Sequence, residues 1–377
     1  MKRFLLIPDS FKGTMSSAEI CGIVEEGLLT HYPDAKIRSI PVADGGEGSV
    51  DAFLQALGGE KKHLTVQGPF GEAMESFYGV LPDKVAVIEM AACAGLPLVG
   101  DTLRPDRTTT YGVGELILAA AKEGCKRIIV GLGGSATNDG GCGAAAACGV
   151  TFRNKEDDSF IPTGGTLGEI ASIDRSTRNP ILDGVTIITM CDIDNPFYGE
   201  TGAAYIFGPQ KGADPEMVKL LDANLRSLAK VIESDLDLDV QTIPGSGAAG
   251  GMGGGMAAFF DSELQMGIET VLDAVHFDEL LGETDMVITG EGKIDGQSLR
   301  GKVVIGVGRR TKKSGVPVIA LVGDIADDAD GAYDEGVAAI FSINRLAIPF
   351  KEAKHRAKLD LLKTVDNLAR FLKTMGW

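Results

Sequence analysis

Short apolar runs alternate with amphipathic stretches along most of the chain. The run RFLLIP at residues 3–8 predicts a first strand, and a second is predicted at KIRSIPV, residues 36–42. Between them, Ser16 and Glu19 have the spacing of a capping box at the start of a helix. Another amphipathic helix is predicted over 49–57. This alternation is typical of α/β proteins with largely parallel sheets.

The same pattern continues to the C-terminus. Further strands are predicted at KVAVIEMA, RIIVGLG, VTIITMCD, DMVITGEG, VPVIALVGD and VAAIFSI, and most of these runs end in a polar or glycine-rich segment. CGAAAACG at 142–149 predicts a helix of small residues packed on a sheet, and other helices are predicted from about residue 301 and over about 350–373.

The length of the chain and a change in its pattern predict two domains. At 377 residues the chain exceeds the size at which one hydrophobic core usually stops growing. We predict a discontinuous α/β domain formed by residues 1–68 plus 285–377, with a second α/β domain, residues 69–284, inserted into it. A single division near residue 150 is the alternative.

The charge of the chain bears on its partners. A net charge of −17 repels phosphodiester backbones and anionic lipid, so we expect neither nucleic acid nor a membrane as partner. A bound polyphosphate would need local lysines, backbone amides and a metal ion.

Cysteine usage and the N-terminus bear on the compartment. The six cysteines form no C-x-x-C motif, and we interpret them as reduced thiols. The start MKRFLLIP has too few apolar residues before Pro8 for a signal peptide, and no apolar run approaches membrane-spanning length. We therefore expect a cytoplasmic protein. The sequence leaves open whether it is a monomer or a homodimer.

Glycine is the compositional outlier, with 51 residues against about 26 expected at average usage. The excess is concentrated in a few segments, most of which follow a predicted strand: DSFKG (9–13), ADGGEG (43–48), GLGGSATNDGG (131–141), GSGAAGGMGGG (245–255) and GEGKIDGQSLRGK (290–302). In open parallel sheets, ligands collect at the carboxyl ends of strands. Because glycine lets successive amides point into one concavity, these segments predict a phosphate-binding backbone.

Two nucleotide-binding motifs are nearly matched. Residues 131–136 fit G-x-G-x-x-A after a strand, but the acidic residue expected about 20 positions later is missing from GVTFRNKEDD. The alternative hypothesis, that the protein is a nicotinamide-dependent oxidoreductase acting on a hydroxy acid, rests on this motif alone. Residues 296–302 fit G-x-x-x-x-G-K, but Val303 stands where a P-loop has Ser or Thr. Lys302 is still well placed to meet a phosphate.

Charged residues are concentrated in the same segments. The acids in them are Asp9, Asp44, Glu47, Asp139, Glu291 and Asp295, and the lysines are Lys12, Lys293 and Lys302; Asp192, Asp194 and Lys211 lie between these segments and are candidates as well. Carboxylates beside a phosphate site are compatible when Mg²⁺ lies between them. The alternatives are structural: Asp9 and Asp44 as caps, and Lys211 as a surface lysine. The few histidines lie away from the glycine-rich segments, so a proton acceptor must be a carboxylate, and Asp139 and Asp192 are the best placed.

The chain resembles the bacterial glycerate kinase family, of the two-domain type without a P-loop. The resemblance rests on segments that occur in the family's order: IPDSFKG, PVADGGEG, VGLGGSATNDGG, CDIDNPFYGETGAAYIFGPQKGA, PGSGAAGGMGGG and VITGEGKIDGQSLRGK. It implies ATP- and Mg²⁺-dependent phosphorylation of D-glycerate to 2-phosphoglycerate, with 3-phosphoglycerate as the alternative product. It also implies a flavodoxin-like inserted domain and an active site in the cleft between the domains.

Roles for individual residues follow as hypotheses. Lys12 and Lys302 contact phosphate oxygens. Backbone amides for the nucleotide come from Gly131, Gly133, Gly134, Ser135, Gly245, Gly247, Gly250 and Gly251. The metal is held by Asp44, Glu291 and Asp295.

The remaining roles concern the acceptor. Either Asp192 or Asp139 takes the proton of the attacking hydroxyl, and Asn138 orients glycerate. Either Arg104 or Lys293 pairs with the glycerate carboxylate.

Overall fold

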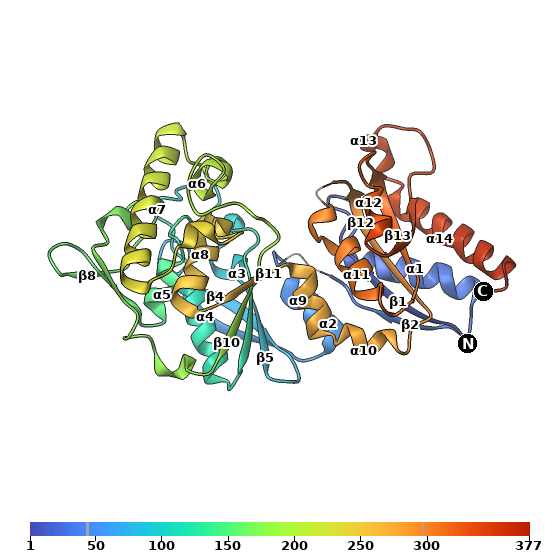
Figure 1. Ribbon diagram of the computed structural model, residues 1–377, viewed down its shortest axis with the longest axis horizontal. Coiled ribbons are helices and arrows are strands. Elements are labelled where there is room, and N and C mark those ends of the chain that lie inside the picture. Colours follow the sequence, from blue (N-terminus) through green and yellow to red (C-terminus); the bar gives the residue numbers. More distant parts are fainter. Residues whose placement is uncertain (43–44, 297) are drawn as a thin grey trace. The chain divides into compact units, whose positions relative to one another are not determined.

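The computed structural model describes residues 1–42, 45–296 and 298–377. The chain divides into two compact units (Figure 1), unit 1 formed by Met1–Ala43 with Met266–Trp377, and unit 2 formed by Asp44–Gln265. Asp44, one of the predicted metal ligands, lies outside the described residues.

Unit 1 is built on a five-stranded parallel sheet with the order β14-β13-β12-β1-β2. Its strands are β1 (Arg3–Pro8), β2 (Lys36–Ser39), β12 (Met286–Ile294), β13 (Val318–Ile325) and β14 (Val337–Ser342). The central pair β1 and β12 joins the two ends of the chain, with Phe4 opposite Met286 and Pro8 opposite Gly290. The first strand therefore pairs with a strand that lies some 280 residues later in the sequence.

Helices cover both faces of this sheet, as the alternation of side chains in a strand requires. In β13, Ile319 and Leu321 pack in a cluster with α1 (Ser17–His31) and α14 (Ala357–Thr374), whereas Ala320 and Val322 pack with α11 (Val303–Thr311). Ser16 caps α1 in the predicted capping box with Glu19. The other helices of unit 1 are α9 (Gly267–Ala274), α10 (Phe277–Leu281), α12 (Gly331–Asp334), α13 (Phe350–Ala353) and the 3₁₀ turn η6 (Ser298–Arg300).

Unit 2 contains a mixed six-stranded sheet with the order β11-β10-β6-β5-β4-β3. Its strands are β3 (Glu60–Gln67), β4 (Ala73–Val80), β5 (Val85–Glu89), β6 (Arg127–Gly131), β10 (Thr186–Met190) and β11 (Glu263–Gln265). The pairs from β5 to β11 are parallel, and β3, β4 and β5 pair antiparallel. A small antiparallel sheet consists of β7 (Thr151–Arg153), β8 (Ser159–Phe160) and β9 (Ser172–Asp174).

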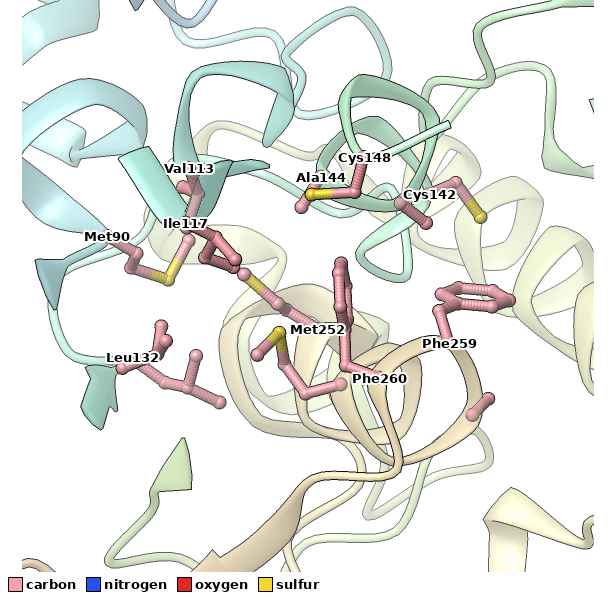
Figure 2. Packing of buried hydrophobic residues seen from close by; sticks show 14 of the residues in the cluster. Met90, Val113, Ile117, Leu132, Cys142, Ala144, Cys148, Met252, Phe259 and Phe260 are labelled. Atoms are coloured by element: carbon pink, nitrogen blue, oxygen red, sulfur yellow. The ribbon is translucent and has the colours of Figure 1, made fainter. Parts of the chain in front are cut away.

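The helices of unit 2 mostly border one continuous hydrophobic core. They are α2 (Ser49–Leu57), α3 (Ala91–Ala94), α4 (Tyr111–Lys122), α5 (Cys142–Ala147), α6 (Ala203–Phe207), α7 (Pro215–Leu236) and α8 (Ala248–Phe260), with 3₁₀ turns η1 (Leu96–Val99), η2 (Leu167–Glu169), η3 (Pro180–Leu182), η4 (Pro209–Lys211) and η5 (Val240–Thr242). Figure 2 shows part of this core, where small side chains of α5 such as Ala144 lie near the larger Met252 and Phe260 of α8. The small-residue helix predicted from CGAAAACG is present as α5.

The predicted class, a mixed α/β protein with largely parallel sheets, is confirmed. Two local predictions are wrong. The glycine-rich segment 245–255 belongs mostly to helix α8, whose φ/ψ angles are non-helical only at residues 249–251. The predicted closing helix is divided into α13 and α14.

The compact units begin and end at positions other than those predicted. The breaks fall after residues 43 and 265, rather than after 68 and 284. Residues 45–68 go with unit 2 because β3 pairs with β4 and α2 packs on β4 and β5. Residues 266–284 go with unit 1 because α9 packs against α11.

None of the described helices is long and apolar enough to span a membrane.

Candidate active site

In unit 1, charged side chains gather where β1 and β12 end. Asp9 follows β1, and its backbone amide donates to the carbonyl of Gly290 in β12. The next residues along the loop lie against the end of β12, since a methyl group built on Gly292 would be 3.6 Å from the backbone nitrogen of Lys12. Because the two strands are parallel and adjacent, the loops that follow them meet at one edge of the sheet.

Glu291 is the buried member of this group, with 4% of its surface exposed. Its Oε2 accepts a hydrogen bond of 3.0 Å from the hydroxyl of Ser298, whereas Oε1 is buried without a partner in the described structure. Burial raises the pKa of Glu291 to about 7; the Ser298 hydrogen bond and the positive charge of Lys302 oppose this shift, and Asp9 and Asp295 add to it. These groups are therefore within electrostatic range of one another.

The lysines of unit 1 differ in their surroundings. Lys302 is half-buried and immediately precedes α11, where the positive end of the helix dipole also favours an anion. Lys12 and Lys293 are exposed. The structure thus brings Glu291, Asp295 and Lys302 together and places the backbone of Lys12 beside β12.

In unit 2, the glycine-rich loop after β6 packs backbone against backbone on the segment that precedes α2. A methyl group on Gly131 would lie 2.2 Å from the carbonyl oxygen of Gly45, and one on Gly133 would lie 2.5 Å from Cα of Gly46. The amide of Gly133 donates to the carbonyl of Gly45 at 3.0 Å. Close packing of the chain on itself therefore explains these glycines without a ligand.

The accessible part of this loop is small. Gly134 is exposed and Gly133 half-buried, whereas Gly131 and Ser135 are buried and Ser135 forms an isolated bridge with Gly95. A ligand would meet the loop at Gly133 and Gly134.

The predicted glycine loop at 245–251 has a packing role. Gly245, Gly247, Gly250 and Gly251 are all buried. The amide of Gly247 donates to the carbonyl of Asn195, and the amide of Gly251 donates to that of Gly247. These amides face protein rather than an open concavity, so we do not retain this segment as a nucleotide-binding loop.

Asp139 is fully buried, and both of its carboxylate oxygens accept hydrogen bonds from nearby residues. Its Oδ2 accepts from the amide of Thr110 at 2.7 Å, from the Thr110 hydroxyl at 2.9 Å and from the amide of Gly143 at 3.2 Å, while Oδ1 accepts from the amide of Gly141 at 3.1 Å. Burial raises the pKa of Asp139, and these hydrogen bonds oppose the shift. The carboxylate thus ties the loop to the start of α4, and we do not retain Asp139 as a proton acceptor.

Asn138, next to Asp139, lacks the hydrogen bonds that Asp139 has. It is fully buried, and neither Oδ1 nor Nδ2 has a hydrogen-bond partner among the residues that the structure describes. A buried amide with both ends unsatisfied is unfavourable unless a partner is supplied from elsewhere. Asn138 therefore stays a candidate for ligand binding.

The other predicted residues of unit 2 lie nearer the surface. Asp192 follows β10 and is exposed. Arg104 is half-buried, and its guanidinium bonds both oxygens of Asp106, at 2.8 and 2.6 Å. This pairing lowers the pKa of Asp106 and already balances the charge of Arg104, through the Nε and Nη2 edge of its guanidinium.

Sequence reasoning missed the buried Glu89 and left the setting of Lys211 open. Glu89, at the end of β5, accepts hydrogen bonds from the amides of Gly48 and Val50 and so caps α2 from a distant part of the chain. Lys211, for which a surface position was one alternative, is only 2% exposed. Its place directly after a Gly-Pro turn gave no sign of burial.

The carboxylates form no complete metal cage in the described residues, where no three or more His, Cys, Asp or Glu side chains are placed to hold a metal ion. Glu291 and Asp295 nevertheless lie together, and the unpartnered Oε1 of Glu291 is the kind of hard oxygen that Mg²⁺ prefers. Mg²⁺ commonly takes only one or two protein carboxylates when phosphates complete its coordination. The residues present fit such an ion.

Lysines and carboxylates at the ends of parallel strands are typical of α/β proteins that bind phosphorylated ligands. Comparison with known proteins gives the particular family. The model of the glycerate kinase family matches residues 4–373, and the chain belongs to this family.

Full-length relatives agree with this assignment. The chain is 43% identical over 371 residues to a glycerate kinase of Halalkalibacterium halodurans and 42% identical over 372 residues to the glycerate 2-kinase of Escherichia coli, with 98% of each chain covered in both cases. A crystal structure of a Salmonella typhimurium protein is similar with a TM-score of 0.87 at 40% identity, covering 100% of this chain and 99% of the other.

Proposed function

We propose that the protein transfers the terminal phosphoryl group of ATP to the 2-hydroxyl of D-glycerate, giving 2-phosphoglycerate and ADP. The observation that carries this proposal is the full-length similarity to a relative named glycerate 2-kinase. In the reaction, the bond between the γ-phosphorus and the β,γ-bridging oxygen breaks, and a bond from that phosphorus to the glycerate oxygen forms. The hydroxyl proton passes to a base.

The transferring phosphoryl group must be positioned and its charge balanced, because in such reactions the protein contributes little covalent chemistry. Lys12 and Lys302 are the groups that we assign to phosphate oxygens. The half-buried setting of Lys302 at the start of α11 supports its assignment, since an ammonium at a helix N-terminus adds to the field of the backbone amides.

Glu291 and Asp295 are the residues that we assign to Mg²⁺. When bound, the ion would neutralise phosphate charge and so offset repulsion from these carboxylates. Lys302 faces the same carboxylates and limits the negative charge of the group. The predicted contribution of Asp44 stays a proposal.

On the acceptor side, we assign Asp192 as the proton acceptor, because it is exposed whereas Asp139 is fully buried and holds four hydrogen bonds. Asn138 orients glycerate. For the glycerate carboxylate we assign Lys293, which is exposed, in place of Arg104, whose charge is already balanced by Asp106.

The experiment that tests the function is a coupled assay with ATP, Mg²⁺ and D-glycerate, followed by ³¹P NMR of the product. We expect turnover and a phosphorus signal coupled to the proton on C2. A signal coupled to the C3 protons would show 3-phosphoglycerate instead. Binding of NADH with no turnover of ATP would contradict the kinase proposal.

The assignment of Lys12 has its own test. Lys12→Ala should reduce kcat/KM by an amount equivalent to about 2–4 kcal/mol, as expected for the loss of a group that stabilises developing charge. Lys351→Ala, which removes an exposed lysine of α13, is the matched control and should leave kcat/KM unchanged. An unchanged kcat/KM in Lys12→Ala would remove Lys12 from the phosphate site.

A further inference from the structure

Lys211 is a buried cation in the interior of unit 2. It ends the 3₁₀ turn η4 and is 2% exposed. A lysine is rarely buried without a specific reason, because removing an ammonium from water is unfavourable. Burial lowers its pKa to about 7, and the negative charge of Asp139 opposes that shift. Asp139 is therefore within electrostatic range and balances its charge.

The ammonium of Lys211 holds one point of the backbone. Its Nζ donates a hydrogen bond of 2.6 Å to the carbonyl oxygen of Thr137, the residue before Asn138. Gly250 of α8 packs closely against the same place, since a methyl group there would lie 2.1 Å from the Thr137 oxygen and 2.5 Å from Cα of Asn138. The backbone at Asn138 is thus fixed by the hydrogen bond from Lys211 and by close packing.

The side chains in this fixed segment are not satisfied by the protein itself. The hydroxyl of Thr137 and both polar atoms of the Asn138 amide are buried without partners in the ranges described. An amide offers a donor and an acceptor side by side. A 2-hydroxy acid presents the complementary pair, a carboxylate oxygen that accepts and a hydroxyl that donates.

We propose that Lys211 is a positioning residue for the acceptor: by holding the carbonyl of Thr137, it aims the amide of Asn138 at the carboxylate and hydroxyl of the 2-hydroxy acid. This inference rests on the proposed function and adds to it a residue that determines affinity for the acceptor. Lys211 acts through Asn138 and contributes nothing to the binding of ATP.

The test is steady-state kinetics of Lys211→Met, which keeps the length of the side chain and removes its charge. We expect the KM for D-glycerate to rise at least about tenfold, the effect of leaving the buried Thr137 carbonyl without its donor, while the KM for ATP changes less than about twofold. Lys230→Met, which removes an exposed lysine of α7, is the matched control and should change neither constant.

A double-mutant cycle separates positioning from general damage. If Lys211 acts through Asn138, then Lys211→Met combined with Asn138→Ala should be no worse for D-glycerate than Asn138→Ala alone. Effects that multiply, or an unchanged KM for D-glycerate in Lys211→Met, would overturn the inference.

If the Lys211→Met variant fails to fold, a second measurement on the wild-type protein tests the inference. In the wild-type protein labelled with ¹⁵N-asparagine, the Nδ2 amide signal of Asn138 should shift when D-glycerate is added and stay in place with ATP alone. An unmoved signal would overturn the inference. A wild-type protein that does not phosphorylate D-glycerate would remove the proposed function and this inference together, whereas an active wild type with either contrary result would remove the inference alone.

Discussion

The backbone of Gly250 lies directly against the carbonyl group of Thr137, so that a methyl group on the glycine would stand 2.1 Å from the oxygen. That separation is well below van der Waals contact. The amide of Gly140 donates to the carbonyl of Gly250, so the two chain segments are also hydrogen-bonded. The glycines of 131–141 and of α8 are therefore needed, at least in part, so that two stretches of main chain can touch.

Gly255→Ala should destabilise unit 2. The added methyl group would lie 2.1 Å from the carbonyl oxygen of Gly140, and neither backbone can move freely inside the core. We expect a loss of at least about 2 kcal/mol in the free energy of unfolding, measured by urea denaturation. The matched control is Gly22→Ala in α1, which meets nothing within 4 Å and is exposed.

The control should change stability in the opposite direction. Because alanine is the better helix former, Gly22→Ala should stabilise the protein by roughly 0.5–1 kcal/mol. If Gly255→Ala were as stable as the wild type, the backbones of α8 and Gly140 would have room for the added methyl group, which would contradict this prediction.

Asp139→Asn and Asp192→Asn should affect different properties. Asp139→Asn places an amide NH₂ among the donors from Thr110, Gly141 and Gly143 and removes the charge opposite Lys211. We expect it to lower the free energy of unfolding by about 3–5 kcal/mol. Asp192→Asn, at an exposed position, should leave stability within about 0.5 kcal/mol and reduce kcat at least about 100-fold.

Urea denaturation and initial rates measure the two effects. An Asp139→Asn variant as stable as the wild type would refute the structural role of this carboxylate. Undiminished kcat in Asp192→Asn would leave the proton acceptor unassigned.

Stability should depend on pH through Lys211. Burial lowers its pKa from the 10.5 of an exposed lysine to about 7 in the folded protein, so between these pH values the unfolded chain binds more protons than the folded one. The free energy of unfolding therefore rises with pH across this window, by about 5 kcal/mol. Below pH 7 both states carry the charge and the full burial penalty applies.

Lys211→Met removes this titration. The difference in unfolding free energy between the wild type and Lys211→Met, followed by urea denaturation from pH 7 to 10.5, should grow in favour of the wild type. A constant difference would indicate that Lys211 is charged in the folded state throughout the window.

Glu89→Gln should weaken the start of α2. Glu89 accepts from the amide of Val50 at 2.6 Å and from that of Gly48 at 3.2 Å, and its negative charge lies at the positive end of the helix. We expect a loss of about 1–2 kcal/mol in unfolding free energy, as for other helix caps. Asp51→Asn, an exposed carboxylate in the same turn, should change stability by less than about 0.5 kcal/mol.

Local patterns predicted most of the regular structure. The predicted strand RFLLIP has the same bounds as β1, and Ser16 and Glu19 form the predicted capping box. These features depend on neighbours in sequence, which is why they can be read from the chain directly. The pairing of β1 with β12 joins residues far apart in sequence, and only the break in the βαβ pattern hinted at it.

The candidate site was harder to predict because burial is not local. Asp139 and Asp192 are both acids after a strand, yet one is fully buried and the other exposed. The glycines of 245–251 match a phosphate-binding composition, but composition does not distinguish a backbone that approaches a ligand from one that approaches another backbone. The burial of Lys211 and the capping role of Glu89 could be recognised only when their partners, Thr137 and Val50, were known.

The two ends of unit 2 meet at Met190. A methyl group on Gly45, near the start of the unit, would lie 3.2 Å from Cβ of Met190, and Gln265, its last residue, is the register partner of Met190 in the sheet. A segment whose entry and exit coincide can be spliced into a surface loop of a host protein without stretching it. Because these two ends are adjacent, we expect residues 45–265 to fold when expressed separately and to tolerate circular permutation.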